Sequence, residues 1–99
     1  ILAHPGLLAP EEAALAARNG IFLELTLRAG HSLANGHVAQ QALRAGARLI
    51  VGSDAHSPKD LLSPDLVETV ARGAGLDSGQ YQQVWHNAHA LLERLAPPL

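Results

Sequence analysis

Cysteine and methionine are absent from this chain of 99 residues, and only Phe22, Tyr81 and Trp85 are aromatic. Without cysteine it forms neither disulfides nor thiolate metal sites, which fits a cytoplasmic protein. The chain has seven basic and nine acidic residues, and the basic ones form no run. This composition argues against a large nucleic-acid-binding surface. No apolar stretch approaches the roughly 20 residues that cross a bilayer, so we expect no membrane partner. The core should consist of Ala, Leu, Val and Ile.

Apolar runs that read as buried strands alternate with helical patterns along the chain. This order indicates parallel strands joined by right-handed crossovers. Three parallel strands suit either a small open sheet or half of a barrel, and the pattern does not choose between them. The expected strands cover residues 1–3, 21–26 and 49–52. The expected helices run from Pro10 to Arg18, from His37 to Ala45, from Ser63 to near Gly73 or Gly75, and from Asp77 or Ser78 to about Leu95.

The chain has no initiator methionine, and its first residues already read as a strand. Strands of parallel sheets are normally buried by neighbours. We interpret the chain as the carboxyl-terminal part of a longer protein, the alternative being a natural end with a trimmed tag.

An Asp-Ala-His sequence follows the third apolar run. In extended chain the side chains of Asp54 and His56 project to the same side, just past the strand. α/β folds place metals and catalysis at this end of a strand, and imidazole with carboxylate suits Zn, Mn or Fe. Alternatively, Asp54 only caps a turn, which leaves His56 unexplained.

His4 ends the first apolar run and precedes Pro5, whose ring favours an extended conformation for His4. The imidazole is either a second metal ligand at a strand end or a hydrogen-bonded turn histidine. Together, His4, Asp54 and His56 predict a metal site assembled from strand ends.

Glu24 interrupts the second apolar run, where a buried carboxylate is costly unless it is paired. It either orients a metal ligand or points to solvent from a sheet edge. Arg28 and His31 follow, close to a helix start that Asn35-Gly36 could cap. An arginine beside a helix amino terminus suits a phosphate, although each of these residues could also lie in a solvated loop.

His86 and His89 are neighbours on one face of the last helix. No strand end delivers further ligands beside them, so we expect this face to be solvated.

Several motifs resemble the later motifs of the PHP (polymerase and histidinol phosphatase) family. They are Ala3-His4-Pro5-Gly6, Leu23-Glu24-Leu25, Gly52-Ser53-Asp54-Ala55-His56 and the Arg-x-Gly-His-Ser-Leu-x-Asn-Gly-His loop from Arg28 to His37. The likeness covers almost the whole chain and is greatest to bacterial proteins described as histidinol phosphate phosphatase domain-containing.

The resemblance implies that residues 1–99 are the carboxyl-terminal portion of a single PHP domain. The fold would be the second half of a distorted (β/α)7 barrel, and its partner would be the missing amino-terminal part of the same barrel. The family's first metal motifs would lie before Ile1. We therefore expect the chain alone to be inactive.

The resemblance also implies up to three divalent metal ions, Zn, Mn or Fe, at the carboxyl ends of the strands. His4, Asp54 and His56 would ligate one ion each, and Asp54 and His56 would carry the catalysis. Arg28 and His31 would hold a substrate phosphate.

The expected function is metal-dependent hydrolysis of a small phosphate monoester, such as histidinol phosphate. The alternatives are a PHP-type nuclease, against which the near-neutral charge argues, and a noncatalytic PHP-like module that keeps a structural metal.

Overall fold

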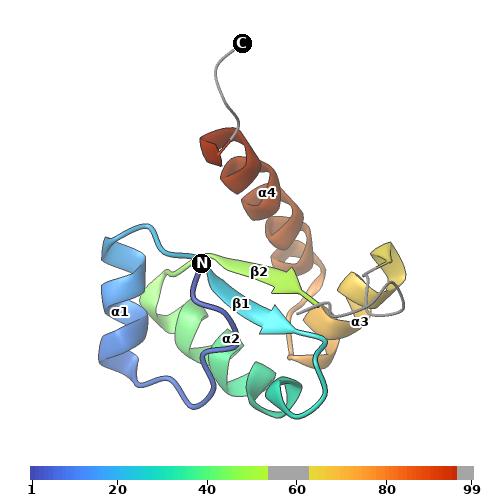
Figure 1. Cartoon of the computed structure of the whole chain (residues 1–99), viewed down its shortest axis with the longest axis horizontal. Coiled ribbons are helices and arrows are strands. Elements are labelled where there is room, and N and C mark those ends of the chain that lie inside the picture. The colour runs from blue at the N-terminus through green and yellow to red at the C-terminus, as the bar shows by residue number, and fades with distance from the viewer. Residues whose placement is uncertain (54–62, 96–99) are drawn as a thin grey trace.

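In the part of the chain that the structure describes, two parallel strands and the helices around them form the fold. The computed structural model describes residues 1–53 and 63–95. β1 and β2 run parallel, with Leu23 opposite Leu49 and Thr26 opposite Gly52, so the predicted parallel pairing is confirmed. In chain order the elements are α1 (Pro10–Arg18), β1 (Leu23–Thr26), the 3-10 helix η1 (His31–Ala34), α2 (Asn35–Ala45), β2 (Leu49–Gly52), α3 (Pro64–Gly73) and α4 (Ser78–Leu95) (Figure 1).

The first predicted strand is reduced to one isolated bridge between Leu2 and Leu23. The Leu2 N–H donates to Phe22 O at 2.8 Å, and the Glu24 N–H donates to Leu2 O at 3.2 Å. The ladder stops there because His4 has a φ of 29°, which turns the chain away, and Pro5 has no N–H to donate.

The prediction of half a distorted (β/α)7 barrel is wrong. The sheet of the described residues has two strands, β1 and β2, with Leu2 bridged to its edge. The radius of gyration of 12.9 Å matches the roughly 13 Å of a compact domain of 100 residues. The chain is therefore a small α/β unit. The order of strands and helices is the same in both architectures, so it does not show whether a sheet continues into a barrel.

The helices lie close to their predicted ranges because the sequence marks their ends. Ser63 Oγ accepts the Leu66 N–H at 3.3 Å at the start of α3. Asp77 Oδ1 accepts the Gln80 N–H at 2.8 Å while Gln80 Oε1 accepts the Asp77 N–H at 2.9 Å, which is a reciprocal cap of α4. Gly46 ends α2 with a φ of 75°, a conformation that glycine adopts without a Cβ clash.

The core lies between the strands and the helices and is mainly aliphatic, as predicted, with Phe22 as its buried aromatic residue. Leu23 and Leu25 of β1 are fully buried, whereas the intervening Glu24 is only half-buried on the opposite face of the strand. The other residues of the main core cluster are Leu8, Ala13, Ala16, Val38, Ala39, Ala42, Ala47, Leu49, Val70, Ala71, Leu76 and Val84.

Two arginines, Arg48 just before β2 and Arg94 of α4, pack on Phe22 at the amino-terminal edge of the strands. The guanidinium carbons of Arg48 and Arg94 each lie 5.6 Å from the ring centroid of the buried Phe22. Arg94 Nη1 also donates to Gly20 O at 3.2 Å. These arginines line a pocket of about 450 Å³ together with Gly20 and Gly46, which follow the carboxyl ends of α1 and α2. Helix carboxyl ends carry partial negative charge, so the structure explains both arginines without a ligand.

Candidate functional site

Glu24 binds the backbone of His4 at the carboxyl edge of the strands. Glu24 Oε1 accepts the His4 N–H at 2.9 Å, and both residues are half-buried. This bond joins the turn after Leu2 to the middle of β1. The side chain of Glu24 therefore holds the main chain of His4, the residue that carries the imidazole.

His4 has a strained backbone. Its φ of 29° lies in the left-handed region, and His4 is alone in this among the non-glycine residues that the structure describes. Such a conformation costs about 1–2 kcal/mol for a residue with a Cβ. Backbone strain is tolerated where the surrounding contacts hold it, and it is frequent at functional sites.

We expect His4→Gly to be more stable than His4→Ala by about 1 kcal/mol. Both variants remove the imidazole, and only glycine also relieves the left-handed strain. At an unstrained position alanine would be the more stable of the two, because glycine loses more backbone entropy on folding. Urea unfolding of the two variants measures the difference, and equal stabilities would show that His4 is unstrained in solution.

The His31 ring lies on the His4 ring. The two ring centroids are 3.9 Å apart, and the ring planes differ by 16°. His31 is the first residue of η1 and follows Gly30, whose φ is 88°. The stack therefore brings together two loops that are separated by α1 and β1.

Arg28 lies just past the end of β1. Its N–H donates to Thr26 Oγ1 at 3.0 Å, and the residue is half-buried. The structure thus places Arg28 and His31 in one loop at the same edge as His4 and Glu24. Asp54 and His56 lie outside the described residues. β2 ends at Gly52, at this same edge and two positions before Asp54.

The predicted metal site is not assembled by the described residues themselves. Within residues 1–53 and 63–95, no group of three or more His, Asp or Glu side chains is placed to hold a metal ion. The hypothesis of a metal site at His4 therefore depends on Asp54 and His56.

Gly52 is part of the site, although the sequence indicated no role for it beyond its place in the Gly52-Ser53-Asp54-Ala55-His56 motif. A Cβ at this position would overlap Glu24 Oε2 and lie 2.9 Å from Glu24 Cδ. The carboxylate of Glu24 thus occupies the space that a larger residue in β2 would fill. The signal in the sequence was a glycine as the last residue of an apolar strand, since glycine in a strand often marks close approach of another group.

Asn35 is the second residue whose role differs from the prediction. It does not cap α2, because it is the first helical residue and Ala34 precedes it as the cap. Its Oδ1 accepts the Thr26 N–H at 3.0 Å, and its Nδ2 donates to Thr26 O at 2.8 Å. Asn35 thus pairs with the end of β1 as a neighbouring strand would, and it fixes the Arg28–His31 loop there.

The remaining histidines lie apart from this site. The His37 Nε2 is 2.6 Å from Leu8 O, and because a carbonyl only accepts, Nε2 carries the hydrogen. This bond ties α2 to the segment before α1. His86 and His89 are exposed on α4, as predicted.

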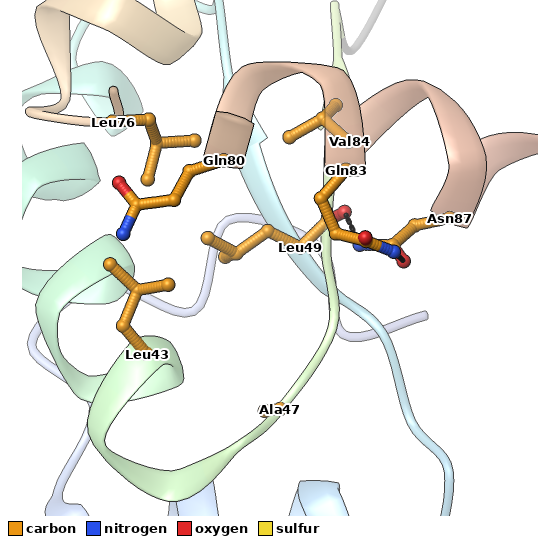
Figure 2. A pocket seen from close by; sticks show the side chains of 8 residues that line it. All are labelled: Leu43, Ala47, Leu49, Leu76, Gln80, Gln83, Val84 and Asn87. Carbon is orange, nitrogen blue, oxygen red and sulfur yellow. Dashed lines mark hydrogen bonds between the residues drawn. The ribbon is translucent and has the colours of Figure 1, made fainter. Parts of the chain in front are cut away.

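A small pocket between α2, β2 and α4 is structural. Its volume of about 70 Å³ is far below the roughly 300–1,000 Å³ of metabolite sites. Figure 2 shows Asn87 at one end, where its Nδ2 donates to Leu49 O at 2.9 Å and its Oδ1 accepts from Gln83 Nε2 at 2.9 Å. Gln83 and Asn87 bond to each other and Asn87 bonds to β2, while Gln80 Oε1 accepts the Asp77 N–H. The rest of the lining is apolar: Leu43, Ala47, Leu76 and Val84.

The fold and the site together define a small α/β unit with a histidine–glutamate–histidine cluster at the carboxyl edge of parallel strands. No protein-family model matches the chain. It is 38% identical over 96 residues to the uncharacterized protein MJ1295 of Methanocaldococcus jannaschii. The alignment covers 96% of this chain and 44% of that protein. No solved structure matches. Of the helices in the described part of the chain, none is long and apolar enough to span a membrane.

Proposed function

We propose that this chain supplies part of a metal-dependent phosphoesterase site of the PHP type, which hydrolyses a small phosphate monoester such as histidinol phosphate. The meeting of His4, Glu24 and His31 at the carboxyl edge of β1 and β2 carries this proposal. These residues come from three separate segments, and β2 ends at that edge just before Asp54. The lack of cysteine fits a cytoplasmic setting for this activity.

The donor chemistry fits a divalent ion. The half-buried imidazole of His4 is proposed as one ligand, and Asp54 and His56 are proposed to complete the set. Mixed imidazole and carboxylate ligands suit Zn, Mn or Fe. Such an ion supplies Lewis-acid stabilisation of negative charge on a phosphate. Glu24 is assigned to holding the His4 backbone, because its Oε1 already accepts the His4 N–H.

Arg28 is proposed to hold the substrate phosphate. Its backbone is fixed to Thr26 at the end of β1, which keeps it in the same loop as His31. A planar guanidinium donates two parallel hydrogen bonds to a phosphate, which orients the ester as well as binding it. The near-neutral charge of the chain favours a small substrate over nucleic acid.

The test has two parts, metal binding and hydrolysis. Titration of this chain with Mn²⁺ or Zn²⁺ by calorimetry should show binding that His4→Ala and Asp54→Ala each abolish. Phosphate release should then be measured on the longest natural polypeptide that contains this sequence. The substrates are histidinol phosphate, a generic phosphomonoester and single-stranded DNA, each with metal or with chelator.

We expect metal-dependent release from histidinol phosphate or the generic ester, lowered by Asp54→Ala to the level without metal. Hydrolysis of DNA alone would indicate a nuclease. Chelator-sensitive stability without any hydrolysis would indicate a noncatalytic metal-binding module. Absence of metal binding to the folded chain and to the longer polypeptide would contradict the proposal.

A further inference from the structure

His4 is held from two sides. Its backbone N–H is bound by Glu24 of β1, and its ring is covered by the ring of His31 from η1. The bond from Glu24 fixes the main chain only, so it leaves the side-chain torsions of His4 free. Among the contacts of His4 with the described residues, the stack with His31 is one that restricts the plane of its ring.

The geometry of the stack argues against His31 as a second ligand of the same ion. The lone pairs of imidazole nitrogens lie in the ring plane, and Zn–N bonds of about 2.0–2.1 Å run along them. Because the two planes differ by only 16°, the lone pairs of the two rings do not converge. A shared ion would have to lie between the planes, out of line with both lone pairs.

The same geometry leaves the His4 ring available as a ligand. Stacking covers a face of the ring, whereas a metal ion approaches the edge that carries the nitrogens. His31 therefore holds His4 without competing for its nitrogens. This arrangement needs a flat ring at position 31 and does not need a nitrogen there.

We propose that His31 is a positioning residue, which fixes the plane of the His4 imidazole through stacking and does not bind the phosphate or the metal. This inference rests on the proposed function, because orienting His4 matters only if His4 binds a metal. The stack of the two rings is independent of that function. It replaces the sequence-based assignment of His31 to the substrate phosphate.

The test compares His31→Phe, which keeps a flat ring without nitrogens, with His31→Ala, which removes the ring. Calorimetric titration of the full chain with Mn²⁺ or Zn²⁺ should give wild-type affinity for His31→Phe. For His31→Ala we expect affinity weakened about 3- to 10-fold, the size of a typical aromatic pair interaction. His4→Ala is the control that loses the ligand itself.

Nuclear magnetic resonance of the metal-free chain gives a second readout. Contacts between the ring protons of His4 and residue 31, and a single His4 side-chain conformation, should be present in the wild type and in His31→Phe. Both should be lost in His31→Ala, while the backbone shifts of β1 stay unchanged.

Equal weakening of metal binding in His31→Phe and His31→Ala would overturn the proposal, because it would show that a nitrogen of His31 is required. Wild-type affinity and an ordered His4 ring in His31→Ala would overturn it as well. If neither the wild-type chain nor the longer polypeptide binds metal, the proposed function fails, and the resonance data still decide whether His31 orders the His4 ring.

Discussion

Gly52→Ala should lower the free energy of unfolding by about 2 kcal/mol, although it adds only a methyl group. The new Cβ would overlap the Glu24 carboxylate, which lies across position 52. Glu24 would have to move, and it would then release the N–H of His4. Metal affinity should fall about tenfold or more, as it does when groups that orient a ligand are lost. Urea unfolding and metal titration of the same preparation measure both effects.

The matched control removes the Glu24 carboxylate, which the new methyl group would meet. In a Glu24→Ala background, Gly52→Ala should leave the free energy of unfolding unchanged or raise it by up to about 1 kcal/mol. The reason is that alanine loses less backbone entropy on folding than glycine. A Cβ added at Gly73, at the end of α3, would meet nothing within 4 Å, so Gly73→Ala should not destabilise the protein. An additive cost of Gly52→Ala in both backgrounds would contradict the close approach of Glu24.

Asn35→Ala should destabilise the chain by about 3 kcal/mol. Thr26 is fully buried, and the substitution leaves both its N–H and its C=O without their partner. An unsatisfied buried polar group costs about 1–3 kcal/mol, and two are created here. The loop with Arg28 and His31 should loosen at the same time, which faster amide hydrogen exchange at Thr26 and Arg28 would reveal.

Two further variants separate these hydrogen bonds from the helix. Asn35→Asp keeps an acceptor for the Thr26 N–H but places a second oxygen against Thr26 O, so it should be nearly as damaging as alanine. Gln40→Ala, on the exposed side of α2, should change stability by less than about 0.5 kcal/mol. A mild effect of Asn35→Asp would show that the bond to Thr26 O is dispensable.

The helices could be predicted from the sequence because their end signals are local. Ser63, Asp77 and Gly46 act within one turn of their own positions, so nearby residues suffice to place them. The parallel pairing of β1 and β2 also followed from the alternation of strand and helix. Whether the sheet continues beyond these strands could not be predicted from that alternation, because it depends on contacts between segments far apart in the chain.

The candidate site shows the same limit. The sequence drew attention to His4, Glu24 and His31 singly, since each is a polar residue beside an apolar run. Their pairing depends on the left-handed turn at His4 and on the path of the loop after β1, and neither has a local signal. Asn35 was predicted as a helix cap because asparagine is common there, yet the end of β1 uses both ends of its amide.

The bond between Asn87 and Leu49 has a consequence for the order of synthesis. The carbonyl of Leu49 emerges from the ribosome 38 residues before the side chain that satisfies it. At translation rates of about 5–20 residues per second, roughly 2–8 s pass between the synthesis of Leu49 and that of Asn87. The α4-facing surface of β2 therefore stays uncovered during that interval, until α4 packs against it.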